Sequence, residues 1–224
     1  MSDIIKNLDW SVLTDILISV IPALLCITFH ELAHGYTAYR LGDTTAKDMG
    51  RLTLNPIKHI DIFGILMMVV FHFGWAKPVP VNMMRFRKPK RYMAITAIAG
   101  PLSNIILAII IFFFYGLFYI SLGGNNTSGA GEVILRMIDR AATLSVALAV
   151  FNILPIPPLD GSKVLFSFLP ESSYYWLMRY ERFGMIILII FVWSSYFDAT
   201  IGRATSAVFQ WLSGVAQFSF NLVN

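Results

Sequence analysis

The 224-residue chain is strongly apolar, with 57% hydrophobic residues and only 13% charged ones. Soluble domains average about 25% charged residues, and here the deficit is concentrated in long blocks. No Asp, Glu, Lys or Arg occurs over 92–131, and further uncharged blocks cover 16–30, 141–159, 183–197 and 204–224. About 20 apolar residues cross the hydrocarbon core of a bilayer. The composition therefore excludes a soluble enzyme, a disordered tail and a nucleic-acid-binding domain. It predicts an all-α polytopic protein embedded in the lipid bilayer.

The size of the chain fits one bundle of four to six membrane segments. Cys26 is the single cysteine and lies in an apolar run, which excludes a disulfide framework and a cysteine zinc site. The residues before the first apolar block include Asp3, Lys6 and Asp9, unlike the basic start of a cleaved signal peptide. We therefore expect the first helix, about Asp15–Ala38, to be retained in the membrane.

Basic residues concentrate in one third of the chain and predict its orientation. Residues 40–91 hold ten of them against three acids, a local charge of +7. Short basic loops between apolar segments stay on the cytoplasmic side, so we expect 40–61 and 77–91 to lie there. The first helix then runs inward, Tyr92–Ile120 crosses outward and Val133–Leu154 returns inward.

Three other segments are assigned from their length and pattern. Ile62–Ala76 is apolar but has only 15 residues and cytoplasmic flanks, which predicts a short re-entrant segment or hairpin. Phe183–Thr200 is long enough to span the membrane. The last block, Ala204–Asn224, carries apolar residues at helical spacing, which predicts a helix lying on the interface or packed against the bundle.

The sequence His30-Glu31-Leu32-Ala33-His34 ends the first predicted helix. Residues four apart lie on one face of a helix, so His30 and His34 can present two imidazole nitrogens to one metal ion. Glu31 is displaced by about 100° around the axis, where it can serve as general base toward water at the metal. The alternative is a pair of buried histidines bonded to a neighbouring helix, although burying three such groups without a function is costly.

A catalytic zinc site needs a third protein ligand. His59 and His72 are close in the sequence, whereas Asp160 lies at the predicted cytoplasmic end of a distant helix. His30 and His34 are expected at that same end of the bundle. Three prolines just before Asp160 hold the chain extended. We therefore favour Asp160 as the third ligand over an Asp-Gly pair that only forms a turn.

Three motifs occur in an order that resembles the site-2 proteases, a family of intramembrane zinc metalloproteases. They are HELAHG from His30, GPLSN from Gly100 and FNILPIPPLDG from Phe151. The stretches LNPIKHID from Leu54 and GWAKPVPVN from Gly74 are similar to the compact prokaryotic branch, without a PDZ or CBS domain.

The resemblance implies one membrane-embedded protease domain over residues 1–224. Its catalytic core covers about 16–163 and contains three helices around a site sunk into the membrane from the cytoplasmic side. Peripheral helices follow at about 164–224. The implied setting is a bacterial or archaeal cell membrane, and the implied partners are transmembrane protein substrates.

The resemblance also assigns roles within the site. It implies one zinc ion per chain, held by His30, His34 and Asp160, with Glu31 as the base that activates water. Asn152, before the proline-rich turn, is expected to position substrate or to stabilise the oxyanion.

Several alternatives stay open at this point. A transporter or proton relay can use the same histidines and carboxylates in a wet cavity, and a non-catalytic membrane scaffold is a further class. Phe63–Trp75 can offer a strand edge to an unwound substrate or can only plug the bundle. Gly100-Pro101 predicts a break that opens a helix, with Asn104 facing the bundle.

Overall fold

The computed structural model describes residues 10–64, 76–122, 124 and 127–222, which form helices and loops without a strand. The helices in chain order are α2 (Trp10–Arg40), α3 (Thr45–Asp48), η1 (Pro56–His59), η2 (Met83–Arg85), α5 (Pro89–Ser121), α6 (Ala130–Asn152), α7 (Asp160–Phe166), α8 (Glu171–Val192) and α9 (Ser195–Asn221). Two helical stretches, Ile18–Arg40 and Pro89–Ser121, are long and apolar enough to cross a membrane. The expectation that the described part of the chain is all-helical is confirmed.

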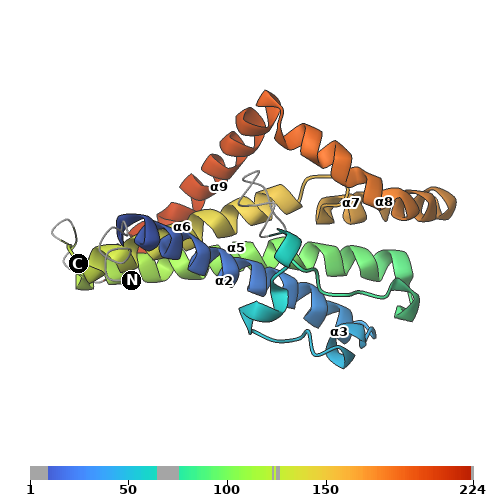
Figure 1. The fold of residues 1–224 in the computed structure, drawn as a ribbon, viewed down its shortest axis with the longest axis horizontal. Helices are drawn as coiled ribbons and strands as arrows, with labels where there is room; N and C mark the ends of the chain where they lie inside the picture. Colours follow the sequence, from blue (N-terminus) through green and yellow to red (C-terminus); the bar gives the residue numbers. More distant parts are fainter. Residues whose placement is uncertain (1–9, 65–75, 123, 125–126, 223–224) are drawn as a thin grey trace, which may run out of the picture.

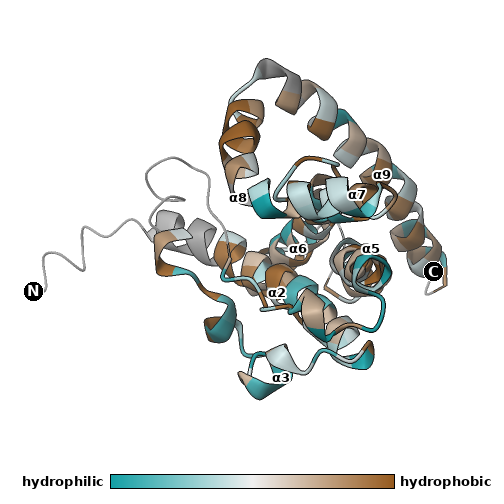
Figure 2. Cartoon of the chain, turned by 90° about the vertical axis from the view of Figure 1, so that its right-hand side faces the viewer, coloured by the Kyte–Doolittle hydropathy of each residue, from teal (hydrophilic) through white to brown (hydrophobic). Residues whose placement is uncertain are grey.

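Three long helices, α2, α5 and α6, form the centre of the molecule. They run side by side in Figure 1, and each one packs against the other two. Seen end-on in Figure 2, the three helices lie close together, and α7 packs against α5. The three helices match the expected segments Asp15–Ala38, Tyr92–Ile120 and Val133–Leu154 to within five residues at each end.

The last helix, α9, packs on α5 and α6 through one apolar cluster. The cluster combines Ala108 and Phe112 of α5, Ala142 and Val146 of α6, and Leu212 of α9. Small residues let helices approach closely, so that van der Waals contact holds them together even where lipid removes the hydrophobic driving force. Of the two alternatives for the last block, packing against the bundle is therefore the correct one.

The expected span Phe183–Thr200 is wrong as a continuous segment. The chain turns at Trp193 and Ser194, where α8 ends and α9 begins, and the two helices diverge from this turn in Figure 1. Ser194 has an extended backbone, with ψ at 147°, so it cannot continue a helix. The apolar half of α8 is the short stretch Phe183–Val192.

The expected break at Gly100-Pro101 is also wrong, because both residues lie inside α5. Proline removes one backbone N–H and disturbs a helix interior, but here the neighbouring helices hold the segment on both sides of it. Asn104 is fully buried, so its predicted position facing the bundle is confirmed. The expected re-entrant segment Ile62–Ala76 falls almost wholly on 65–75, outside the described residues.

The position of α8 depends on a glycine. A Cβ at Gly184 would overlap the backbone and ring of Pro157 in the proline-rich turn. Glycine therefore lets α8 lie directly against this turn. The contact brings Glu181, one helical turn earlier, to the end of the bundle where α7 begins.

Candidate metal centre and catalytic cavity

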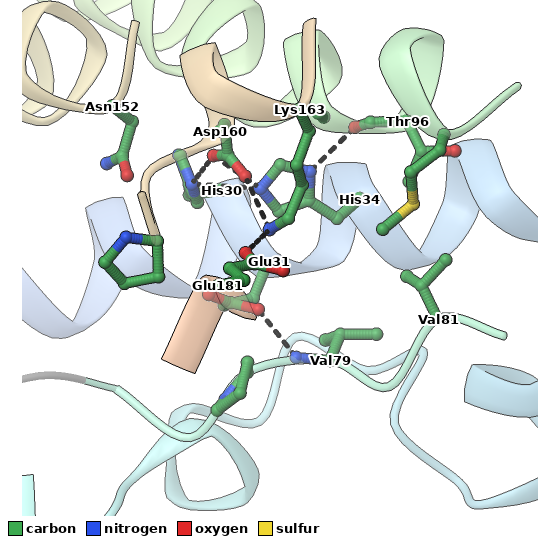
Figure 3. A pocket seen from close by; sticks show the side chains of 14 residues that line it. His30, Glu31, His34, Val79, Val81, Thr96, Asn152, Asp160, Lys163 and Glu181 are labelled. Carbon is green, nitrogen blue, oxygen red and sulfur yellow. Dashed lines mark hydrogen bonds and ion pairs between the residues drawn. The ribbon is translucent and has the colours of Figure 1, made fainter. Parts of the chain in front are cut away.

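The structure brings together His30 and His34 of α2 with Asp160 at the start of α7. The Nε2 atoms of the two histidines lie 3.0 Å apart, and each lies 3.1 Å from Oδ2 of Asp160. All three residues are buried. These three side chains form a group that could hold a metal ion, and Figure 3 shows them converging on one point.

The triangle of ligand atoms fits zinc. Zinc binds histidine nitrogen at about 2.0–2.1 Å and carboxylate oxygen at about 2.0–2.2 Å in a tetrahedron. Neighbouring ligand atoms in such a tetrahedron lie about 3.3 Å apart. The observed sides are a few tenths of an ångström shorter, and the donor set of two imidazoles and one carboxylate is typical of catalytic zinc.

Helix α5 orients both histidine rings. His34 Nδ1 lies 2.7 Å from the carbonyl oxygen of Thr96, and His30 Nδ1 lies 3.3 Å from the side-chain amide of Asn104. Between these two contacts, Gly100 faces the rings, and a Cβ there would overlap both of them. The GPLSN motif therefore supplies the space that the two rings occupy.

The proline-rich turn places Asp160 at the first position of α7. A carboxylate in the first turn of a helix is stabilised by the helix dipole. Burial raises the pKa of the Asp160 carboxyl, but the adjacent histidines and Lys163 outweigh burial and hold the pKa well below its ordinary range. This environment favours the charged form of Asp160, which is the form that binds a metal ion.

A cavity of about 330 Å³ opens beside the triangle and has an excess of carboxyl groups. Glu31, Asp160 and Glu181 line it, and Lys163 is the one Lys or Arg among its described lining residues. Lys163 Nζ lies 3.4 Å from Glu181 and 3.7 Å from Asp160. Burial lowers the pKa of Lys163, but the two carboxylates reverse this and raise it above its ordinary value. The carboxyl groups of the cavity outnumber its Lys and Arg side chains by two, a balance that suits a divalent cation.

Glu31 projects into the cavity from the same helix turn as the histidines. Its Oε2 accepts a hydrogen bond of 2.7 Å from the backbone N–H of Val79. The neighbouring residues Pro78 and Pro80 have no N–H of their own, so Val79 is the donor in this stretch that can turn toward α2. The carboxylate is thereby held beside the metal-ligand triangle, as Figure 3 shows.

Buried polar side chains of the preceding segment hold the segment that carries Val79. Arg51 Nη2 donates to the carbonyls of Lys77 and Pro78 at 2.8 and 3.3 Å. Asp43, which is fully buried, accepts the backbone N–H of Asn82 at 2.6 Å. The basic segment 77–91 therefore contributes to the wall of the cavity, and residues of 40–61 hold it in place.

Asn152 lines the same cavity from the end of α6, across the site from Thr96 in Figure 3. Its Nδ2 donates to the carbonyl oxygen of Leu148 at 3.0 Å, which uses one of its two amide hydrogens. His59 does not approach the cavity. It is buried in the turn of η1, with Nε2 3.0 Å from the carbonyl oxygen of Thr53. His72 lies outside the described residues.

The sequence reasoning did not assign a role in the site to Lys163, Glu181, Thr96 or Val79. Lys163 follows Asp160 by three residues, and this spacing on a helix was a usable signal. Glu181 belongs to a segment expected to be peripheral. Thr96 and Val79 act through backbone atoms, so their residue types do not predict these contacts.

Comparison with known proteins gives a consistent result. The model of peptidase family M50 matches residues 118–195. "Putative zinc metalloprotease YwhC" of Bacillus subtilis (strain 168) is 42% identical over 174 residues, which cover 77% of this chain and 79% of that protein.

More distant relatives carry the same description. "Putative zinc metalloprotease Rip2" of Mycolicibacterium smegmatis is 28% identical over 75% of this chain and 63% of its own length. "Putative zinc metalloprotease MJ0611" of Methanocaldococcus jannaschii is 29% identical over 66% of this chain and 69% of its own length. No solved structure matches the chain.

The first prediction concerns metal content. The wild-type protein, purified without a histidine tag, is expected to hold about one zinc per chain. His30→Ala and Asp160→Ala each remove one corner of the triangle and are expected to lose this zinc. Elemental analysis of the detergent-solubilised protein measures it. Asp139→Asn, on the exposed side of α6, is the matched control and should keep the zinc. Full zinc in either ligand variant would contradict the assignment.

The second prediction concerns Gly100. In Gly100→Ala, the added methyl group displaces the rings of His30 and His34, so zinc affinity should fall by about 10-fold or more, as for other losses of ligand orientation. Competition with a chelator of known affinity measures it. Gly214→Ala in α9, where a Cβ meets nothing within 4 Å, should bind zinc as the wild type does. Equal affinities in the two variants would show that the close approach at Gly100 is unimportant.

Proposed function

The chain belongs to peptidase family M50, the site-2 protease family of zinc metalloproteases, and on this premise we propose that it is an intramembrane endopeptidase. Its proposed reaction is hydrolysis of peptide bonds in or near the transmembrane segments of membrane-protein substrates. The observation that carries the proposal is the buried triangle of His30, His34 and Asp160 beside a carboxylate, Glu31. A proton relay is not favoured, because the named relatives are described as zinc metalloproteases.

In this proposal, His30, His34 and Asp160 hold the zinc and Glu31 moves the proton. Zinc supplies a Lewis acid that polarises the scissile carbonyl and lowers the pKa of water. Glu31 accepts a proton from the attacking water and passes it to the nitrogen of the leaving amine. The hydrogen bond from Val79 aims the carboxylate into the cavity. Asn152 has a second amide hydrogen to offer to the developing oxyanion.

The chemistry of the reaction favours an extended substrate. The carbonyl of a residue inside an α-helix is shielded by its own i→i−4 hydrogen bond. A transmembrane substrate must therefore unwind locally before Glu31 and the zinc can reach its peptide bond. Gly, Pro, Ser or Asn near the cut would favour this step.

The proposed arrangement in the membrane follows from the positions of the charges. The site lies at the end of α2 that leads into the basic segments 40–61 and 77–91, so it faces the cytoplasm by the positive-inside rule. We propose that α2, α5 and α6 all cross the membrane and carry the catalytic core at about 16–163. In the peripheral part at 164–224, α8 still contributes Glu181 to the cavity.

The third prediction tests the role of Glu31. Glu31→Gln keeps the shape of the side chain and its hydrogen-bond acceptor, but it cannot take a proton. Cleavage of a membrane-protein substrate in vesicles should fall by about 10²-fold or more, while the zinc content stays at the wild-type level. Loss of zinc would assign Glu31 to the metal instead, and retained cleavage would exclude it as the base. Glu132→Gln, in an exposed ion pair with Arg136, is the control.

The fourth prediction tests substrate unwinding. Single glycines placed near the cut in a model transmembrane substrate should speed cleavage by about fivefold each, because glycine destabilises a helix by about 1 kcal/mol relative to alanine. Substrates with alanine or leucine at the same positions should be cleaved more slowly than those with glycine. Single-turnover cleavage rates across the substrate series measure this effect. Rates that do not depend on helix propensity would show that another step is limiting.

A further inference from the structure

Helix α5 presents three positions, each one helical turn from the next, to the two histidines of α2. They are Thr96, Gly100 and Asn104, which share a face because they are spaced by four residues. Thr96 contacts His34 and Asn104 contacts His30. The order is consistent with two antiparallel helices, and the outer two positions serve one ring each.

The contact at His34 shows what each ring requires. A neutral imidazole carries one N–H and one lone pair, and a ring that binds metal through Nε2 must keep its proton on Nδ1. His34 Nδ1 lies 2.7 Å from the carbonyl oxygen of Thr96, which can only accept. The backbone therefore fixes the tautomer of His34 and leaves its Nε2 lone pair for the metal.

His30 has no backbone carbonyl among its described Nδ1 contacts and faces Asn104 instead. Asn104 is fully buried, and its Oδ1 has no hydrogen-bond partner in the described part of the chain. Its Nδ2 lies 3.3 Å from His30 Nδ1. A half-turn about the Cβ–Cγ bond exchanges the oxygen and nitrogen of an amide without changing its shape. That half-turn brings the unpartnered oxygen to the ring.

We propose that Asn104 is a positioning residue for the zinc site, whose side-chain oxygen accepts the Nδ1 proton of His30. This contact fixes the ring orientation and directs the Nε2 lone pair toward the metal. It gives a function to an amide that is fully buried. The inference rests on the zinc site proposed above.

Two substitutions at Asn104 separate this role from packing. Asn104→Leu keeps the number and branching of the side-chain heavy atoms and removes the acceptor, so zinc affinity should fall by about 10- to 100-fold, as for other partners that orient a ligand. Asn104→Asp keeps an oxygen acceptor and removes the amide nitrogen, so it should bind zinc within about threefold of the wild type or more tightly. Competition with a chelator, on the full-length protein in detergent, gives all three affinities.

Ser145→Ala is the matched control. Ser145 is equally buried on α6, and its Oγ donates to the backbone carbonyl of Asn104 at 2.8 Å. The substitution Ser145→Ala disturbs the same part of the core but does not remove a contact to His30. The zinc affinity of this variant should therefore equal that of the wild type. Thermal unfolding with zinc chelated checks that each variant is folded. If Asn104→Leu does not fold, Asn104→Ala, which also lacks the acceptor, takes its place.

Three results would overturn the proposal. They are wild-type affinity in a folded Asn104→Leu or Asn104→Ala, a loss in Asn104→Asp as large as in Asn104→Leu, or an equal loss in Ser145→Ala. Because zinc affinity is read without cleavage, failure here is distinct from failure of the proposed proteolysis. If the wild-type protein does not cleave substrates but Asn104→Leu binds zinc more weakly than the wild type, only the proposed proteolysis is refuted.

Discussion

The arrangement of the helices depends on one constraint, which is that two imidazoles and one carboxylate are buried together in an apolar bundle. Such groups are costly to bury unless each is partnered. Here the ligand atoms lie within 3.1 Å of one another and the rings are held from behind by α5. His30 and His34 belong to α2, and Asp160 belongs to α7. The three side chains can therefore contact one another, and be held by α5, only if these three helices pack together at this point. The proline-rich turn and Gly100 make this approach possible.

The charged groups around this point divide into two kinds. Asp43 and Arg51 lie outside the cavity and hold the loop that carries Val79. Lys163 and Glu181 line the cavity and link α7 to α8. The chain therefore has an interior with specific polar contacts, although its overall charge content is low. The few ionisable groups that are present at this depth each have a defined partner.

Much of the fold follows from periodicity and length alone. The three central helices were predicted to within five residues, because long and mainly apolar segments are expected to form buried or membrane-crossing helices. The two failures have different causes. Pro101 lies within α5 because contacts with α2 and α6 support the helix on both sides, and such contacts are not visible in a proline's own neighbourhood. The run after Phe183 divides at Ser194, because its apolar part ends at Val192 and a new helix begins at Ser195.

The sequence by itself predicted the two histidines of the candidate metal centre, because the spacing of His30 and His34 places them within one helix turn. It also favoured Asp160, through the proline-rich turn before it. Only the tertiary structure decided what orients these groups. The carbonyl of Thr96 and the N–H of Val79 are backbone atoms, identical in every residue, so no residue type predicts their contacts. Glu181 and Asn104 reach the site from other helices, and their distance from it in the sequence carries no information about their distance in space. Local geometry can be read from spacing, but the surroundings of a site depend on how whole helices pack.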